Sequence, residues 1–480
     1  MSSVPLDERR EFWRNFDFQY NSTHPGLRPM RRAMWELPHW MHWLGGTLQA
    51  HGHTDLGVLD LYTEPGTVGR LGTLNSATVR ASVRASPADV YLFSPMTVNL
   101  PFAYQIAEEI KEATPAATVV FGGVVATPLA EEVARHRAVD YVVVERGEIA
   151  LPALLRTLAK KSDPSAVGNL VFQAPDGRMV RTGFRYPDMP AKDIPFPAVD
   201  LFDAAAGADI RYLRQVYALG CPYKCTFCTI QTIGRRPDYF PIERVLCEIR
   251  RYRERYGTHH NIYWGDETFT LYPDRTLRLL AALEREGDIG YDCQTRLNCL
   301  TDDRVLRALE RSGCRWVEIG LETGVQSSHD RHKHHMKLTP VEETLLRVRD
   351  AGLAACAFTV NGFPDQTLDD MRRSVDWVCD LIDRDLLQAS YLFGLVPYPG
   401  SAMYRDPDQF GMRLLHTDHG RYHEDLPPVF ATAHATPDQV YEVFLDALKS
   451  LGQAMGKQPY FGTPTEPAEG YGAFWAGAHV

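Results

Sequence analysis

The chain has 480 residues, of which 44% are hydrophobic and 23% charged, a balance that excludes a disordered or fibrous protein. Its length predicts two or three domains, with a core large enough to need no disulfide staples. The formal net charge of −10 disfavours a general binder of nucleic acid or of anionic membranes, because such proteins carry net positive charge.

No apolar run reaches the roughly 18–20 residues that span a bilayer. The N-terminal segment MSSVPLDERREFWRN is charged and lacks the apolar stretch of a signal peptide, so we expect a cytoplasmic protein without a membrane partner. Nine cysteines, an odd number, argue against a disulfide framework. Six of them stand singly and are expected to be small buried hydrophobes: Cys247, Cys293, Cys299, Cys314, Cys356 and Cys379.

Short apolar segments alternate with amphipathic ones in the first third of the chain. Strands are predicted over 55–62, 88–97, 118–127 and 139–148. Helices are predicted between them, because apolar residues recur there at the spacing of a helix face. This alternation predicts an α/β fold with a parallel, doubly wound sheet of the Rossmann type. The first domain is expected to cover residues 1–165.

The segment 166–205 has a different character. LVFQAPDGRMVRTG is typical of a hairpin with its turn at Pro175-Asp176-Gly177, and PDMPAKDIPFPAVD carries four prolines, as an extended linker does. From 206 to 404 the alternation resumes with six strands, the first five each followed by a helix. A full barrel has eight strands, so six predict an open, partial (β/α)6 barrel. Residues 405–480 are expected to form a C-terminal extension with one clear helix, near DQVYEVFLDALKSLGQ.

Three cysteines give the strongest chemical signal in the chain. Cys221-Pro-Tyr-Lys-Cys225-Thr-Phe-Cys228 follows the first strand of the second domain. The spacing places three thiols on one short loop, close enough to bind a single iron–sulfur cluster. Three ligands leave one iron open to a small molecule, as catalytic zinc sites leave one position open. The alternative is zinc with a fourth ligand, for which the nearest candidates are Cys247 and the His259-His260 pair.

Further polar and glycine-containing segments stand at the ends of the following strands: Trp264-Gly265-Asp266-Glu267, Gln294-Thr295-Arg296, Gly320-Leu321-Glu322-Thr323-Gly324, Asn361-Gly362-Phe363-Pro364-Asp365 and Pro397-Tyr398-Pro399-Gly400. With the cysteine motif and the aromatic Phe227 before its last cysteine, they resemble, in order, the radical S-adenosylmethionine (SAM) superfamily over roughly residues 210–400. The resemblance implies a [4Fe–4S] cluster held by Cys221, Cys225 and Cys228. It also implies that SAM is cleaved to a 5′-deoxyadenosyl radical, which abstracts a substrate hydrogen. SAM contacts are then expected from Phe227, Glu267, Gln294, Arg296, Glu322, Asn361, Phe363 and Pro397.

The fourth strand of the barrel carries two carboxylates at alternating positions. Side chains alternate across a strand, so Glu318, Gly320 and Glu322 share one face. Two carboxylates would be costly in a packed apolar core, and we expect this face to line a polar cavity rather than a solvated edge. The segment SHDRHKHHMK just beyond this strand contains His329, His332, His334 and His335; it is expected to be a solvated or substrate-rim loop rather than a metal site.

The first domain resembles the cobalamin-binding domain that precedes many radical SAM barrels. The matching segments are Ser94-Pro95-Met96, Gly122-Gly123 and Glu145-Arg146-Gly147-Glu148. Tyr62 stands where the lower-ligand histidine of that family would lie, and His51 and His53 precede the strand and are expected on the surface. Cobalamin is therefore doubtful as a cofactor: we expect a domain that keeps the fold, and an activity that is the same with and without cobalamin.

Chain length, the altered first domain and the acidic balance most resemble the radical SAM diol dehydratases of aminoglycoside (apramycin-type) biosynthesis. That resemblance implies a lyase in antibiotic biosynthesis that dehydrates a paromamine-like amino sugar, a reductase that supplies electrons, and an NADPH-dependent dehydrogenase partner. Carboxylates suit a cationic substrate, so Asp266 and Glu318 are expected to bind it. Tyr217 either donates a proton to the departing hydroxyl or belongs to the core.

Two alternatives stay open. The first is a cobalamin-dependent radical SAM methyltransferase or oxidative cyclase, which the same two domains would also suit. The second is a non-catalytic iron–sulfur electron carrier or sensor, which would leave the long SAM-type barrel unexplained. The sequence does not distinguish the substrates, because substrate contacts lie on loops.

Overall fold

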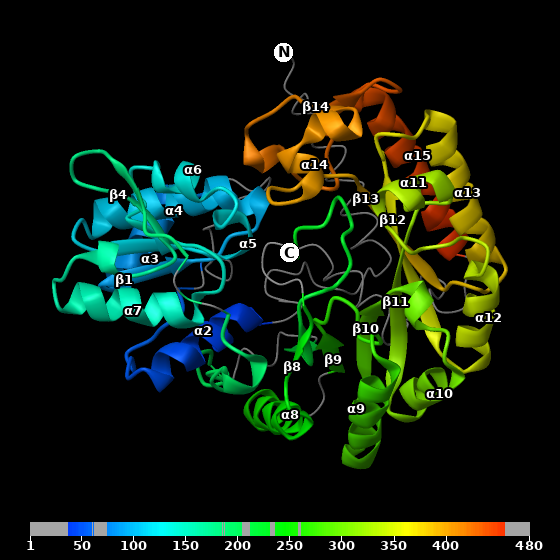
Figure 1. Cartoon of the computed structure of the whole chain (residues 1–480), viewed down its shortest axis with the longest axis horizontal. Helices are drawn as coiled ribbons and strands as arrows, with labels where there is room; N and C mark the ends of the chain where they lie inside the picture. The colour runs from blue at the N-terminus through cyan, green and yellow to red at the C-terminus, as the bar shows by residue number, and fades with distance from the viewer. Residues whose placement is uncertain are drawn as a thin grey trace.

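The computed structural model describes residues 37–59, 61, 74–184, 186, 188–203, 212–230, 236–257 and 261–456. In this part of the chain an N-terminal α/β domain lies beside a larger α/β barrel, and a C-terminal segment contacts both (Figure 1). No helix of the described ranges is both long and apolar enough to cross a lipid bilayer.

The N-terminal sheet has five strands in the order β1-β2-β3-β4-β5. The parallel strands are β1 (Val90–Phe93), β2 (Thr118–Phe121) and β3 (Tyr141–Val143). One face packs on α3 (Ser76–Ala85), α4 (Leu100–Ala113), α5 (Gly123–Ala126) and α6 (Ala130–Ala134), and the other on α2 (His39–Ala50) and α7 (Gly147–Ala159). Helices on both faces of parallel strands confirm the predicted doubly wound fold.

Two details of this domain differ from the sequence prediction. The predicted hairpin forms as β4 (Leu170–Gln173) and β5 (Met179–Arg181), but it pairs antiparallel with β3 and extends the sheet. The predicted strand over 55–62 is not observed: residues 55–59 form no ladder, and residues 60 and 62 lie outside the described part. Leu56 nevertheless packs on one face of the sheet and Leu59 on the other, so the segment packs in place without strand pairing.

The second sheet is the predicted partial barrel, with six parallel strands in the order β13-β12-β11-β10-β9-β6. The strands are β6 (Tyr212–Gln215), β9 (Asn261–Trp264), β10 (Tyr291–Thr295), β11 (Cys314–Glu322), β12 (Ala354–Asn361) and β13 (Ala389–Gly394). The helices that follow the first five are α8 (Ile242–Tyr256), α9 (Pro273–Glu286), α10 (Asp303–Arg311), α12 (Val341–Asp350) and α13 (Leu368–Asp383). Short strands β7 (Ala218–Leu219) and β8 (Asp238–Tyr239) pair beside the cysteine loop. Because the ladder is fully parallel, the carboxyl ends of all six strands meet at one edge, where the predicted site residues stand.

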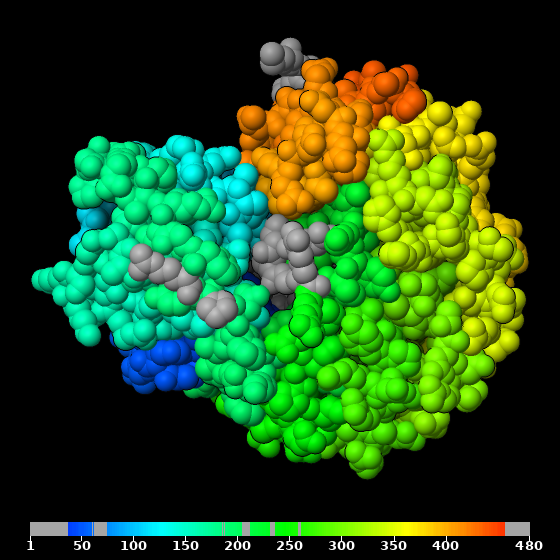
Figure 2. All heavy atoms as spheres, in the orientation of Figure 1, coloured from blue at the N-terminus to red at the C-terminus, as the bar shows by residue number. Residues whose placement is uncertain are grey.

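The C-terminal segment completes the barrel and reaches the N-terminal domain. The predicted helix forms as α15 (Pro437–Met455), and Phe444, Ala447 and Leu451 pack into the barrel core. Between β13 and α15, α14 (Ala402–Arg405), β14 (Met412–Leu414), the 3-10 turn η8 (His419–Arg421) and β15 (Phe430–Thr432) form a lobe. Figure 2 shows this lobe, in orange, against both the N-terminal domain and the barrel. His419 Nδ1 of the lobe lies 3.4 Å from Glu132 Oε1 on α6.

Candidate active site

The three cysteines lie on one loop at the carboxyl end of β6. Cys221 is buried, Cys225 and Cys228 are half-buried, and the Cys228 amide donates to the Cys225 carbonyl at 3.2 Å. Burial raises the pKa of Cys221, and burial with the charges of Glu267 and the other two cysteines raises that of Cys228 to about 12. Cys221 and Cys228 are therefore poor nucleophiles as free thiols, and a bound cation would be needed to hold these two as thiolates.

A single metal ion does not suit this arrangement. Among the described residues no three His, Cys, Asp or Glu side chains converge where one ion could bind. The His259-His260 pair of the zinc alternative lies outside the described residues. In an iron–sulfur cube each thiolate binds a different iron, so three thiols on one loop need not converge on a point. The donor set thus fits a cluster with one open iron.

His332 fastens the cysteine loop to the turn after β12. It is fully buried; its Nε2 lies 2.8 Å from Asp365 Oδ1 and its Nδ1 3.0 Å from Thr226 Oγ1. The Thr226 amide also donates to the His332 carbonyl at 3.0 Å, and the imidazole stacks on Phe363. The prediction of a solvated loop is wrong for His329 and His332, which are 1% and 0% exposed, although His334 and His335 are exposed. Helix α11 (Gln326–His332) turns its buried face, with His329 and His332, toward the barrel.

We expect His332→Ala to lower the free energy of unfolding by about 2–4 kcal/mol, because it strips two buried hydrogen bonds and leaves the Asp365 carboxylate without its imidazole partner. The loop around Thr226 would loosen, and a reconstituted cluster would be lost faster to a chelator. Urea unfolding and iron release measure the two effects. His334→Ala, at an exposed position of the same segment, is the control; equal behaviour of the two variants would contradict this role.

Glu322 ends β11 in an unusual backbone conformation. Its φ of 58° is in the left-handed region, at a register shift between β11 and β12. Lys333 Nζ donates to Glu322 Oε1 at 2.5 Å and to the Gly320 carbonyl at 2.8 Å, and both side chains are almost wholly buried. Strained backbone of this kind persists where its surroundings hold it in place, and it gathers at functional sites.

The other expected SAM contacts surround the cysteine loop. Phe227 meets Phe363 edge to face, with ring centroids 5.7 Å apart. Asn361 Nδ2 donates to the Val440 carbonyl at 3.2 Å, while its buried Oδ1 has no hydrogen-bond partner. Since no described residue donates to this acceptor, a ligand could do so, and the amino group of a purine base would supply the hydrogen bond. Pro397 is buried just after β13.

Glu267 follows β9, at the carboxyl edge of the barrel sheet. It is exposed to solvent, yet the surrounding protein raises its pKa, which the nearby Arg214 lowers in turn. Its charge also raises the pKa of Cys221 and Cys228. Glu267 is therefore placed to meet a ligand beside the cysteines.

Glu318 points into the barrel, as the alternation of β11 predicts. Tyr263 Oη donates to Glu318 Oε2 at 2.8 Å, and the Gln294 side chain donates to the same hydroxyl. Glu318 is 1% exposed, so it ends an internal polar chain that runs from Gln294 through Tyr263. Burial, with the charge of Asp292, raises the pKa of Glu318 to about 8.

This shift predicts a pH-dependent stability. The folded protein keeps the Glu318 proton up to about pH 8, whereas the unfolded chain releases it near pH 4.5. Stability from this group is therefore lost as pH rises between those values, by about 4–5 kcal/mol in all. Glu318→Gln cannot titrate, so it should gain stability relative to wild type across this window in urea unfolding. Glu343→Gln, at an exposed site, should show no such trend; a constant difference for Glu318→Gln would contradict the shift.

Two predicted substrate residues do not face the barrel mouth. Asp266 is 2% exposed, and its carboxylate accepts from the Tyr217 and Ala218 amides at 2.8 and 2.7 Å, so it fastens the end of β6 instead of binding a substrate. Tyr217 packs in the core between sheet and helices, with its hydroxyl 3.5 Å from the Arg275 carbonyl. This packing agrees with the core alternative for Tyr217, and its role as a proton donor stays a prediction.

The carboxyl edge of the N-terminal sheet meets the lobe over the barrel. The turn η1 (Thr97–Asn99) follows β1 and contacts η8. Tyr404 packs both against the buried core of the N-terminal domain and against the cluster that contains Phe363. The carboxyl edges of the two sheets are therefore joined through this lobe.

Parts of this edge fit a large planar cofactor. Met96 is 60% exposed on the loop after β1, which leaves an apolar side chain for a ligand to cover. Gly123 has a φ of +86°, and a Cβ there would lie 2.3 Å from Ser94 Oγ, so the two loops approach closely only because this residue is glycine. Tyr62, at the expected lower-ligand position, lies outside the described residues.

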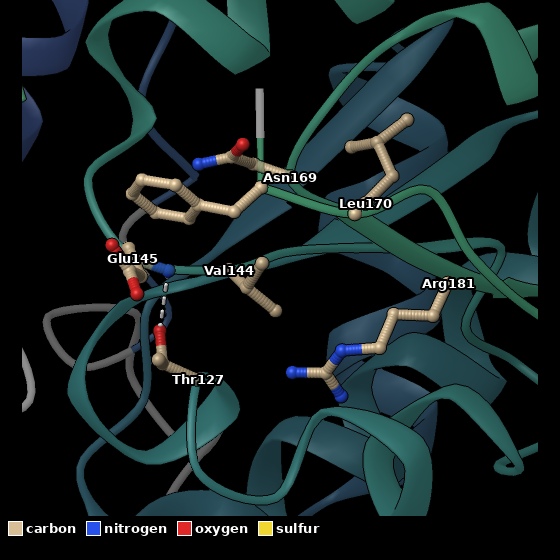
Figure 3. Close-up of a pocket in the computed structure, with 8 residues that line it drawn as sticks. Thr127, Val144, Glu145, Asn169, Leu170 and Arg181 are labelled. Atoms are coloured by element: carbon tan, nitrogen blue, oxygen red, sulfur yellow. Dashed lines mark hydrogen bonds between the residues drawn. The ribbon is translucent and has the colours of Figure 1, made fainter. Parts of the chain in front are cut away.

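A small cavity of about 80 Å³ opens at the end of β3. Thr127, Glu145 and Arg181 are among the residues around it, and the Glu145 amide donates to Thr127 Oγ1 (Figure 3). Ligand pockets for drug-sized molecules are several-fold larger. The cavity holds a few waters at most and is separate from the cysteine loop.

Two cations near the site were not predicted from the sequence. Arg214 lies inside the barrel, with its guanidinium 5.0 Å from the Tyr263 ring centroid, and its charge lowers the pKa of Glu267 and Glu318. Lys333 holds Glu322. The alternation of β6 from Tyr212 could have placed Arg214 inward; for Lys333, in a segment dense with histidines, the pattern gives no such indication.

Known proteins resemble both halves of the chain. The model of the B12 binding domain matches residues 36–155 and that of the radical SAM superfamily residues 216–378. The uncharacterized methyltransferase PH0819 of Pyrococcus horikoshii is 26% identical over 356 residues, 73% of this chain and 75% of that protein. The anaerobic magnesium-protoporphyrin IX monomethyl ester cyclase of Rubrivivax gelatinosus is 22% identical over 383 residues, 77% and 66% of the two chains.

A solved structure shares the fold of nearly the whole chain. It is the radical SAM methyltransferase TsrM of Kitasatospora setae with cobalamin and a [4Fe–4S] cluster bound, which aligns with a TM-score of 0.68 over 90% of this chain and 87% of its own. The sequence identity is 16%. The likeness supports the fold alone, an N-terminal α/β domain followed by an α/β barrel.

Proposed function

We propose that this chain, which joins a B12-binding domain to a radical SAM barrel, is a cobalamin-dependent radical SAM enzyme that methylates or cyclises a small molecule. The observation that carries the proposal is the meeting of the two sheet edges across Tyr404. The matching relatives support it, since one is named a methyltransferase and another a cyclase.

Cys221, Cys225 and Cys228 would hold the cluster. With SAM bound, a [4Fe–4S] cluster supplies the one-electron chemistry that generates a radical. The protein's own part is to bind and orient: Glu322, fixed by Lys333, and the unpaired Asn361 oxygen would fix SAM on the loop side. Phe227 and Phe363 would exclude water from it, which protects reactive species.

Cobalamin is part of this proposal, which departs from our expectation for the first domain. That expectation rested on Tyr62 in place of a histidine. The match to the B12 binding domain extends across residues 36–155, and the close approach of Gly123 to Ser94 beside an exposed Met96 suits a corrin face. We therefore propose that the loops with Ser94, Met96 and Gly123 would hold cobalamin.

Dehydration of an amino-sugar diol has less support. Asp266 and Tyr217, two of the three residues expected to carry it, are engaged in the fold. Glu318 is enclosed in the barrel. A cationic substrate, an electron-supplying reductase and an NADPH-dependent dehydrogenase partner stay predictions, as does the cytoplasmic location.

Cobalamin binding tests the proposal. The full chain, reconstituted anaerobically with iron and sulfide, is mixed with hydroxocobalamin and passed through a desalting column. We expect a corrin absorbance near one equivalent per chain in the wild type, and at least a tenfold loss of affinity in Gly123→Ala, where a Cβ would press on Ser94 Oγ. Gly452→Ala, at a helical glycine with open space around it, is the control. A cluster-loaded wild type that retains no cobalamin would contradict the proposal and favour a first domain that keeps the fold without the cofactor.

A further inference from the structure

Arg296 follows β10 and reaches the cysteine loop. The resemblance to the superfamily places it among the SAM contacts. In the structure its Nη1 instead donates to Sγ of Cys225, 3.3 Å away. The side chain is almost wholly buried, since the residue is 5% exposed.

Neighbouring groups fix the plane of this guanidinium. Nη2 donates to the His334 carbonyl at 2.8 Å, and Nε to Asn298 Oδ1 at 3.3 Å. The guanidinium carbon lies 3.9 Å from the ring centroid of Tyr223, which belongs to the cysteine loop itself. The direction of the N–H toward Cys225 is thus set by contacts on the other nitrogens and on the ring face.

The positive charge of Arg296 has no carboxylate partner. Within the described residues no Asp or Glu oxygen lies within 4.0 Å of its guanidinium. Arginine stays protonated in proteins, so a full charge sits against the sulfur of Cys225. An almost wholly buried cation without an acidic partner is costly and suits a site that becomes negative when loaded.

We propose that Arg296 sets the reduction potential of the [4Fe–4S] cluster through its hydrogen bond to the Cys225 thiolate. The proposal rests on the cluster site of the proposed function. Reduction adds one electron, from an external low-potential reductant, to a cube that three thiolates already make negative. A cation at the sulfur stabilises the reduced form more than the oxidised form, because the negative charge is larger after reduction. Hydrogen bonds to cluster sulfurs are one of the determinants of such potentials.

The test is a redox titration of the full, cluster-loaded protein, followed by electron paramagnetic resonance of the reduced cluster, first without SAM and then with it. Arg296→Gln removes the charge, and Arg296→Lys keeps the charge but loses the planar fork. We expect Arg296→Gln to lower the equilibrium constant for one-electron reduction at least tenfold, which lowers the reduction potential by about 59 mV. The potential of Arg296→Lys should lie between those of Arg296→Gln and the wild type. Arg250→Gln, at an exposed ion pair on α8, should match the wild type.

The titration distinguishes an effect of Arg296 on the reduction potential from an effect on SAM binding. Full cluster content with an unchanged potential in both Arg296 variants would overturn the proposal, and a loss of SAM affinity alone would return Arg296 to the SAM contacts. If Arg296→Gln binds no cluster, the same titration is carried out on Arg296→Lys and on Tyr223→Leu, which removes the stacking ring. A lowered potential in these variants would support the proposal, and an unchanged potential would overturn it. A wild type that binds no cluster would instead contradict the proposed function.

Discussion

Cys228→Ala should abolish SAM cleavage while leaving the N-terminal domain folded. Thiolate ligation is strong, and two remaining cysteines cannot hold the cluster in its place at the end of β6. The N-terminal sheet keeps its own two cores, one on each face, so its folding does not depend on the loop. Iron and sulfide content, SAM-derived products and circular dichroism measure these effects.

Cys247→Ala is the matched control, because Cys247 stands alone on α8 and is likewise half-buried. It should keep the cluster and the activity. Normal SAM turnover in Cys228→Ala would remove the basis for a cluster at this loop. Cys221→Ala and Cys225→Ala should also abolish SAM cleavage, because each of the three cysteines is expected to bind a different iron and none can replace another.

Lys333→Met should cause a large loss of both folding stability and SAM binding. It leaves the buried Glu322 carboxylate unpaired on a left-handed backbone, and breaking a buried ion pair from one side costs about 3–5 kcal/mol. Urea unfolding measures this, and we expect SAM binding to fail as well, because the end of β11 would no longer be held.

The double variant Glu322→Gln with Lys333→Met separates the two effects. Replacing both charges leaves no uncompensated group, so most of the stability should return. SAM affinity should stay at least tenfold below wild type if Glu322 binds SAM. A stable double variant with wild-type SAM affinity would show that the pair serves the fold alone.

Sequence patterns were sufficient for the barrel and for the placement of most strand-end residues. A ladder of six parallel strands collects its carboxyl ends at one edge, and the cysteine loop meets the turn after β12 there, through Phe227 and Phe363. The alternation of β11 also placed Glu318 inside the barrel. These features follow from local periodicity and topology, which a sequence carries directly.

Other features depended on contacts that periodicity does not carry. Tyr217 and Asp266 stand just past the ends of β6 and β9, where strand alternation no longer fixes direction, and Asp266 is directed by backbone amides of the neighbouring segment. The burial of His332 arises from Asp365, 33 residues further along the chain. The segment 55–59 has the apolar pattern of a strand, but it packs beside the sheet without strand pairing.

Quantifying SAM-derived products by mass spectrometry, in the cluster-loaded chain with a reductant and with cobalamin either supplied or withheld, tests the central claim most directly. The account predicts 5′-deoxyadenosine or S-adenosylhomocysteine at rates that rise at least tenfold when cobalamin is supplied. A fully loaded cluster that cleaves no SAM under either condition would contradict the account.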